Sequence, residues 1–199
     1  MLYPRTVEQG TPITDNQMVG AGEHLMNTKR VCFLSGAFVG SMDAHNYLLA
    51  LDSLSHDPIK LIITSPGGDL DSAFLLYDTI RLISSPVYTL GRYCASAAAL
   101  ILASGNKNKR YLMPHAKVML HLLSGQMGGD ARDWEIQHRQ MQVYEKKMIE
   151  LLLECGVKKD YDEILHDIDR DKWLEPEEAI EYGIADKVMD KKTLGGWLA

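Results

Sequence analysis

The chain has 199 residues, which is enough for one sizeable hydrophobic core and short for two. It is 46% hydrophobic and 24% charged, as an ordinary globular protein is, and its net charge of −6 argues against a nucleic-acid-binding protein, which usually carries a basic stripe. The three cysteines, Cys32, Cys94 and Cys155, are odd in number and widely spaced, so they indicate neither a disulfide framework nor a zinc site.

The first segment, residues 1–22, is polar and is expected to be irregular. It lacks the apolar central region of a secretory signal. No segment of the chain is long and apolar enough to span a membrane. Together with the cysteine pattern, these observations predict a cytoplasmic protein that does not bind membranes.

From residue 30 to about residue 105, strand-like and helix-like segments alternate. Short apolar runs bounded by Gly or Pro separate segments whose apolar residues follow helical spacing. Strands are expected at 30–36, 59–65 and 86–91, and helices at 41–56, 71–84 and 96–105. This alternation predicts a largely parallel sheet of right-handed βαβ units, in which ligands bind at the carboxyl ends of the strands.

The second half of the chain is predicted to be mainly helical. Residues 109–121 hold two short strand-like pieces, and the Gly-rich stretch 122–133 is expected to be flexible. Helices are expected at 134–156, 158–168 and 175–183, the last with Pro176 in its first turn. No repeat and no domain linker is evident, so one domain is predicted.

Two features lie just beyond predicted strand ends. The sequence Ser-Pro-Gly-Gly at 65–68 follows one strand, and Ser96 lies between another strand and an Ala-rich helix. Ser96 alone could be a helix cap or a packed small residue. Among the seven histidines, His121 ends an apolar strand-like run and should also lie at a strand end. The pattern alone leaves open a buried structural role for this histidine.

A serine at such a position becomes a nucleophile when an imidazole accepts its proton and a carboxylate orients the imidazole. Backbone N–H groups must then stabilise the oxyanion, and glycines allow the close approach that this requires. The chain has no G-x-S-x-G elbow, no phosphate-binding P-loop and no H-E-x-x-H zinc motif. A metal and a bound nucleotide are therefore not expected.

Taken together, the motifs resemble those of the Clp protease proteolytic subunit family, ClpP. Residues 65–121 follow the family's order of SPGG, a Y-D-x-I helix, G-x-x-A-S, a G-x-K-x-K-R turn and P-x-x-x-V-M-x-H. The stretch 167–186, DIDRDKWLEPEEAIEYGIAD, is similar to a second family motif. The resemblance extends over most of the chain, from about residue 22 to residue 189.

The resemblance implies an α/β fold of the ClpP/crotonase type, a superhelix of repeated ββα units with a protruding strand–helix handle at about 122–156. It implies one peptidase domain over 23–190. An N-terminal axial or gating segment would occupy 1–22, and a C-terminal tail would occupy 191–199.

The resemblance also implies the site residues. It assigns a serine endopeptidase triad of Ser96 as nucleophile, His121 as base and Asp171 as the acid that orients the base. The oxyanion donors would be the backbone N–H groups of Gly68 and Ala97.

The implied assembly is two stacked seven-membered rings, a homo- or hetero-oligomer that encloses a chamber. Asp169 and Arg170 resemble the family's ion pair between the rings. The implied partner is an AAA+ unfoldase, which would use the ATP and deliver unfolded polypeptides, so this chain would need no cofactor.

Some positions depart from the family pattern. Ala97 stands where Met is common, HLL at 121–123 replaces H-Q-P, and Lys60 and Ile62 replace tyrosines that often line the unfoldase-docking pocket. These changes favour a divergent, active paralogue. Two alternatives remain: a non-catalytic or conditionally active ring subunit of a hetero-oligomeric Clp protease, and an acyl-CoA enzyme of the crotonase type, which would use the glycine donors without the triad.

Overall fold

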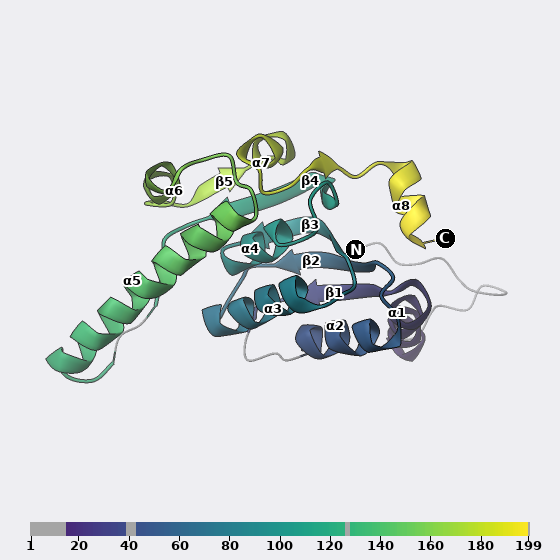
Figure 1. The fold of residues 1–199 in the computed structure, drawn as a ribbon, viewed down its shortest axis with the longest axis horizontal. Coiled ribbons are helices and arrows are strands. Elements are labelled where there is room, and N and C mark those ends of the chain that lie inside the picture. The colour runs from purple at the N-terminus through teal and green to yellow at the C-terminus, as the bar shows by residue number, and fades with distance from the viewer. Residues whose placement is uncertain (1–14, 39–42, 126–127, 199) are drawn as a thin grey trace.

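The computed structural model describes residues 15–38, 43–125 and 128–198 (Figure 1). The helices within these residues are α1 (Asp15–Lys29), α2 (Asp43–Leu54), α3 (Leu70–Leu82), α4 (Ala97–Ala103), α5 (Ala131–Glu154), α6 (Tyr161–Asp167), α7 (Pro176–Tyr182) and α8 (Lys191–Leu198). The strands are β1 (Val31–Ser35), β2 (Ile59–Ser65), β3 (Val87–Ala95), β4 (Arg110–Leu120), β5 (Lys172–Leu174) and β6 (Lys187–Val188). None of the described helices is long and apolar enough to cross a membrane.

The strands form one sheet in the order β1-β2-β3-β4-β5, with β6 paired to β4. Strands β1 to β4 are parallel, and only β5 is antiparallel to its neighbour β4. This confirms the predicted α/β class and the largely parallel sheet. The parallel arrangement brings the carboxyl ends of β2, β3 and β4 to the same edge.

The main hydrophobic core lies between one face of the sheet and helices α2 to α5. Alternate residues of β2, namely Ile59, Leu61 and Ile63, are fully buried there. All seven residues of α4 are also buried, which explains its continuous apolar sequence. The core therefore fixes the turn between β3 and α4 rigidly.

Helix α5 projects from this body (Figure 1). It begins with a capping box, in which Asp130 and Asp133 satisfy each other's backbone N–H groups. Its buried residues, from Met148 to Leu152, all lie in its last two turns. At about 1.5 Å per residue, its 24 residues span about 36 Å, so most of the helix extends beyond the core as the predicted handle.

Three expectations about secondary structure were wrong in part. Residues 15–22 belong to α1 instead of being irregular, because α1 packs against β1 and α8; residues 1–14 lie outside the described part of the chain. Strand β3 continues to Ala95. The two predicted pieces at 109–121 form one strand, β4, but its pairing with β3 is interrupted between Leu112 and Lys117. Pro114 lies in this gap, where its missing N–H breaks no ladder bond.

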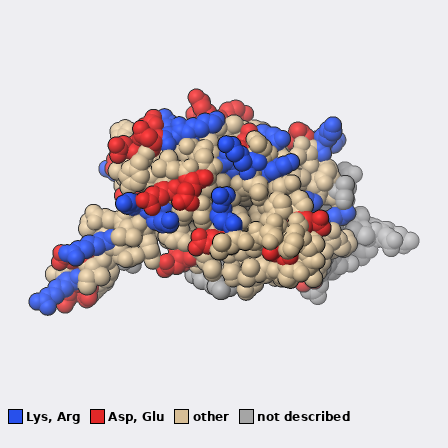
Figure 2. All heavy atoms as spheres, in the orientation of Figure 1, with Lys and Arg blue, Asp and Glu red and all other residues tan. Residues whose placement is uncertain are grey.

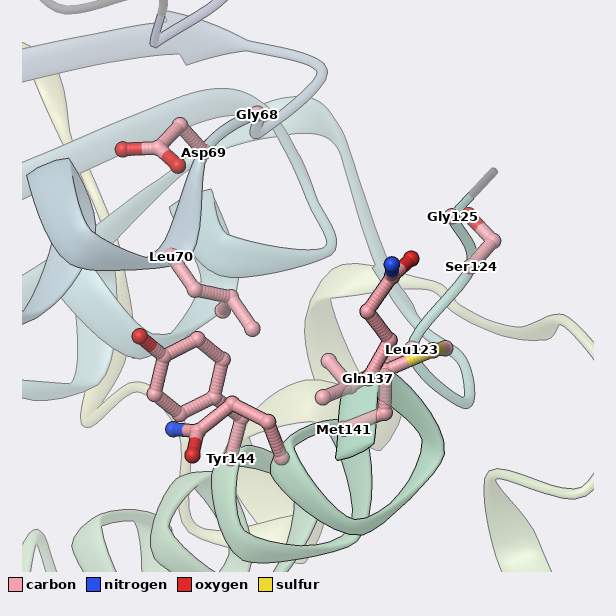
Figure 3. Close-up of a pocket in the computed structure, with 10 residues that line it drawn as sticks. Gly68, Asp69, Leu70, Leu123, Ser124, Gly125, Gln137, Met141 and Tyr144 are labelled. Carbon is pink, nitrogen blue, oxygen red and sulfur yellow. The ribbon is translucent and has the colours of Figure 1, made fainter. Parts of the chain in front are cut away.

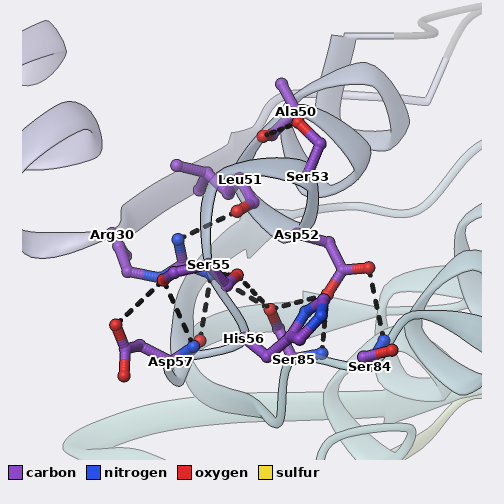
Figure 4. A network of polar contacts seen from close by, with 10 residues as sticks. All are labelled: Arg30, Ala50, Leu51, Asp52, Ser53, Ser55, His56, Asp57, Ser84 and Ser85. Carbon is purple, nitrogen blue, oxygen red and sulfur yellow. Dashed lines mark hydrogen bonds and ion pairs between the residues drawn. The ribbon is translucent and has the colours of Figure 1, made fainter.

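A polar network secures the start of β1 (Figure 4). The Arg30 guanidinium donates to the carbonyls of Leu51 and Ser55 and to the Ser85 hydroxyl, at 2.9 to 3.0 Å. Asp52 accepts from both the backbone N–H and the hydroxyl of Ser85, at 2.7 and 2.8 Å. The network thereby joins the end of α2 to the entrances of β1 and β3.

Charged side chains of both signs are interspersed on the face shown in Figure 2. Blue and red groups alternate along the projecting handle and over the elements that follow it. This face has no continuous basic stripe of the kind that nucleic-acid-binding proteins present.

Candidate active site

Ser96 lies in the turn between β3 and α4. Its backbone has φ 56° and ψ −129°, a conformation that residues other than glycine adopt at a cost of about 1–2 kcal/mol. Its N–H donates to the carbonyl of Met119 at 2.8 Å, which helps to hold the turn. Although Ser96 is the N-cap residue of α4, its side chain makes no capping bond. The hydroxyl is therefore free for another partner.

That partner is His121. Nε2 of His121 lies 2.8 Å from Oγ of Ser96. The register of the two parallel strands explains the contact: Ala95 at the end of β3 pairs with Met119 near the end of β4, so the next residues meet at the same edge. The structure thus brings together the two residues that sequence reasoning paired.

Asp171 is placed differently. Leu120 pairs with Lys172 across the antiparallel strands β4 and β5. The next residue of β4 is His121 and the residue before Lys172 is Asp171, so the backbones of these two residues are neighbours. Its side chain is nevertheless exposed and forms no hydrogen bond or ion pair with any residue between 15 and 198 that the structure describes. The ladder between β4 and β5 ends at the pair Leu120–Lys172, and beyond it the Leu122 N–H donates to the carbonyl of Ile168 at 2.8 Å.

Asp169 and Arg170 lie on the same exposed segment. The Arg170 guanidinium contacts the Asp169 carboxylate at 3.4 Å and its carbonyl at 2.6 Å. Their side chains are 65% and 88% exposed, respectively. Among the residues that the structure describes, these two side chains form an ion pair only with each other, and both are exposed.

The glycines of the Ser-Pro-Gly-Gly turn approach their neighbours more closely than any other residue could. Gly67 has φ +89°, and a Cβ there would lie 2.7 Å from the Ala95 carbonyl and 2.8 Å from Ser96 Cβ. Gly68 has φ +146°, and its Cβ would lie 2.4 Å from the Phe38 carbonyl. The positive φ values and these short distances explain why the turn needs glycine at both positions, whereas their close approach to a substrate stays a prediction.

The N–H groups of Gly68 and Ala97 have no acceptor among the described residues. The neighbouring bonds of the Gly68 turn run from Phe38 N–H to the Gly67 carbonyl and from Asp69 N–H to the Phe38 carbonyl. Ala97 is the first residue of α4, where an N–H has no partner within the helix. Both donors are free to bind an oxygen of a ligand.

A cavity of about 490 Å³ opens beside the serine and the histidine. It adjoins a second cavity of about 350 Å³ under the handle, since both are lined by Gly68, Asp69, Leu70, Leu123 and Ser124. In Figure 3, Leu70 and Tyr144 face Leu123 and Met141 across this second cavity. The two cavities form one groove from the serine to the base of α5.

Sequence reasoning missed the contribution of α5 to this groove. Gln137, Met141 and Tyr144 line it. Their spacing of four and three residues places them on one helix face, which is the signal that could have identified them. The Tyr144 hydroxyl donates to Asp71 at 2.6 Å and ties the handle to the start of α3.

The cysteines are poor candidates for a nucleophile. Burial raises the pKa of Cys32 and of Cys155 to about 11, and it also raises the pKa of Cys94. Across the described residues, no group of three or more His, Cys, Asp or Glu side chains could hold a metal ion.

Comparison with known proteins identifies one family. The family model described as Clp protease matches residues 17–192. The chain is 36% identical over 173 residues to "ATP-dependent Clp protease proteolytic subunit 4, chloroplastic" of Arabidopsis thaliana, covering 83% of this chain and 58% of that protein. It is 33% identical to "ATP-dependent Clp protease proteolytic subunit 1" of Frankia casuarinae, covering 94% and 87%. It is 36% identical to the protein of the same name from Protochlamydia amoebophila, covering 88% and 87%.

Proposed function

The chain belongs to the Clp protease family, and we propose that it is a serine endopeptidase subunit that cleaves unfolded proteins and peptides through an acyl-enzyme on Ser96. The observation that carries this proposal is the 2.8 Å contact between Ser96 Oγ and His121 Nε2 on a strained turn. A hydroxyl with a free imidazole nitrogen at that distance has its proton acceptor in place.

The proposed reaction has two halves. His121 Nε2 takes the Ser96 proton as Oγ attacks the peptide carbonyl carbon, and the carbonyl oxygen becomes an oxyanion. The tetrahedral intermediate collapses, the C–N bond breaks, and His121 returns the proton to the leaving amine. Water, deprotonated by His121, then attacks the ester carbonyl; the bond to Ser96 Oγ breaks, His121 returns the proton to Oγ, and the carboxylate product leaves.

The oxyanion would be held by the N–H groups of Gly68 and Ala97, both of which lack an acceptor among the described residues. Losing one such donor typically lowers the rate by about 10² to 10³. The substitution of Ala for the common Met at position 97 leaves this backbone donor in place.

The groove suggests how substrate is selected. A peptide lying beside Ser96 would place one side chain in the cavity lined by Leu70, Leu123 and Met141. These are apolar walls, so we expect cleavage next to a large apolar side chain. Backbone pairing along the extended segment before α5 would tolerate many sequences elsewhere in the substrate.

The exposed position of Asp171 favours the alternative that this chain is a conditionally active ring subunit of the same family. Because its carboxylate does not reach His121 in the single chain, the subunit could be active only within a ring, or only in a ring that contains another paralogue. In the assembly that we propose, two stacked heptameric rings with Asp169 and Arg170 at their contact, the 169–171 segment would be repositioned. Asp171 would then orient His121.

We also propose that ATP is used by an AAA+ unfoldase that binds the ring, since this chain has no P-loop of its own and its relatives are named ATP-dependent. The chain itself would need no cofactor or metal. A cytoplasmic location is proposed as well, although the Arabidopsis relative is named as chloroplastic.

The test is intact-mass spectrometry after treatment with a fluorophosphonate, on the wild-type chain and on Ser96→Ala. Ser104→Ala is the matched control, because Ser104 is a buried structural serine that bonds the Ile101 carbonyl. We expect a single adduct that is retained in Ser104→Ala and absent in Ser96→Ala. An adduct that persists in Ser96→Ala would refute the assignment, whereas no adduct until a paralogous subunit is added would establish the conditional alternative.

A further inference from the structure

Near its end, β4 directs one apolar side chain away from the main core. Val118 and Leu120 are buried in that core, so Met119 between them points to the opposite face of the sheet. Met119 pairs with Trp173 of β5, and paired residues of neighbouring strands share a face. The two side chains therefore lie next to each other on the face opposite the core, and Met119 is only two residues from His121.

Trp173 forms an aromatic pair with Tyr93 of β3. The two ring centroids are 6.1 Å apart and the ring planes meet at 41°. Strands β3 and β5 lie on opposite sides of β4, so their backbones are about 9.6 Å apart, and the two rings must lean toward each other over β4. Trp173 is nevertheless 48% exposed. Tyr93, Met119 and Trp173 thus form an open apolar surface, which we call the aromatic shelf.

The aromatic shelf is continuous with the catalytic cavity, because Met119 belongs to both. The cavity of about 490 Å³ beside Ser96 is lined by Leu123 and Ser124 where it joins the groove under the handle. Outside that shared part it is lined by Pro66 and Met119. An extended ligand can therefore run from the handle groove, past Ser96, to the shelf.

The reaction determines which half of a substrate would reach the shelf; this step rests on the proposed function. The acyl half would place its apolar side chain in the groove under the handle. The leaving amine receives its proton from His121 Nε2 and must therefore lie against this residue. From His121 the strand β4 runs back to Met119, away from the handle. The leaving half of the substrate would thus extend toward the shelf.

A charged pair limits the depth of the shelf. Lys117 precedes Met119 by two residues, so it lies on the same face of β4, and its ammonium group pairs with the Glu175 carboxylate. Two residues of a strand span about 7 Å, which leaves room for one side chain between His121 and this pair. The shelf is therefore matched to a single apolar side chain.

We propose that Tyr93, Met119 and Trp173 bind the first side chain on the leaving-group side of the scissile bond and favour an aromatic or large apolar residue there. Aromatic rings attract one another in tilted and edge-to-face arrangements, and a thioether sulfur adds a favourable contact with a ring. Covering the exposed Trp173 ring also removes apolar surface from water. Cleavage would then depend on the side chains on both sides of the scissile bond.

The test is acyl transfer from Ser96 to added amines, measured on the full-length protein. The acyl donor is a peptide methyl ester that ends in leucine, and the amines are glycinamide, alaninamide, leucinamide and phenylalaninamide. The amine nitrogen attacks the acyl-enzyme carbonyl, His121 Nε2 accepts a proton from the amine, the bond to Ser96 Oγ breaks, and Oγ regains the proton. Because the amide and acid products come from the same acyl-enzyme, their ratio reports binding of the amine and not the rate of acylation.

We expect phenylalaninamide to give a product ratio at least about tenfold higher than glycinamide, as apolar pockets typically discriminate. Trp173→Ala should lower this preference to less than about threefold, whereas Trp173→Phe should retain most of it. Phe33→Ala is the matched control, at an aromatic residue of β1 that is 49% exposed, and it should leave the preference unchanged. Equal ratios for all four amines in the wild type would overturn the proposal without any variant. A preference that survives in both Trp173→Ala and Tyr93→Ala would overturn it as well.

A fluorophosphonate adduct on Ser96, measured on each preparation, separates this inference from the proposed function. An adduct together with equal product ratios would overturn the shelf and leave the peptidase intact. If no preparation, with or without a paralogous subunit, gave an adduct or any ester hydrolysis, the proposed function would fail and the shelf with it. Sedimentation velocity completes the test: if Trp173→Ala disrupts assembly but keeps the amine preference, the shelf is a contact between copies of the chain and the proposal is wrong.

Discussion

Gly67→Ala should lower the catalytic rate strongly while the chain still folds. Gly67 has φ +89°, and a Cβ there would lie 2.7 Å from the Ala95 carbonyl, 2.8 Å from Ser96 Cβ and 2.9 Å from Ala97 N. All three distances are too short for real contacts, so the backbone around Ser96 has to shift. The same shift moves the hydroxyl away from His121 and turns the Ala97 N–H.

The magnitude has two parts. An alanine at positive φ costs about 1–2 kcal/mol of stability wherever it occurs. Displacing a catalytic group by about 1 Å costs about 100-fold in rate. Gly36→Ala isolates the first part, because Gly36 has a similar φ of +81° but a Cβ there would meet no atom within 4 Å.

The assay is hydrolysis of a fluorogenic peptide, with the unfolding temperature measured alongside. We expect Gly67→Ala to lose more stability than Gly36→Ala, because its short contacts add to the cost of the positive φ, and only Gly67→Ala to lose about 100-fold or more in kcat/KM. Activity of Gly67→Ala within threefold of Gly36→Ala would refute the reasoning, because the close approach to Ser96 would then have no catalytic consequence.

Two further predictions concern stability. Arg110 is buried and bonds Asp186 through two nitrogens, at 2.7 and 3.1 Å, so Asp186→Asn should lower the free energy of unfolding in urea by about 3–5 kcal/mol. The control is Glu135→Gln, in the exposed pair with Arg139, which should lower it by less than about 1 kcal/mol. Equal losses in the two variants would contradict this prediction. Hydrogen bonds from the Ser85 hydroxyl and backbone lower the pKa of Asp52 to about 2, below the value of about 3.9 in an unfolded chain. Asp52 therefore stabilises the fold above pH 4 and loses that effect as pH falls toward 2. Over this range the unfolding temperature of Asp52→Asn should fall less steeply than that of the wild type. Parallel plots of unfolding temperature against pH for the two proteins would exclude the effect.

The parallel half of the fold could be predicted from sequence because its signals are local. The run from Ile59 to Ser65 is apolar and β-branched and ends at Pro66, so both its strand character and its end are encoded within eight residues. The pattern also placed Ser96 and His121 at strand ends, and the family resemblance implied that they pair; the parallel register of β3 and β4 brings them together.

Other features depend on contacts that a local pattern does not contain. The seven residues from Asp15 to Ala21 are polar or small on average, and they are helical because the helix they begin packs against β1 and α8. Met141 and Tyr144 line the groove only because α5 leaves the core beside α3, a placement fixed by the Tyr144–Asp71 bond far from the serine in sequence. The sequence predicted the handle, but not which of its faces would line the groove.

His121 contacts Ser96, whereas the side chain of Asp171 is exposed, and this difference follows from the strands to which the two residues are attached. Ser96 and His121 extend two long, central, parallel strands, whose ladder and buried α4 leave their ends little freedom. Asp171 precedes β5, which has three residues and pairs only at the antiparallel edge of the sheet. The side chains of its neighbours Asp169 and Arg170 pair with each other and with no other side chain among the described residues. The nucleophile and its base are therefore set by the core of the single chain, whereas the acid lies on an exposed segment that an intermolecular contact could move at little cost. On this argument, assembly would act on catalysis through the orientation of His121, and would leave the Ser96 turn unchanged.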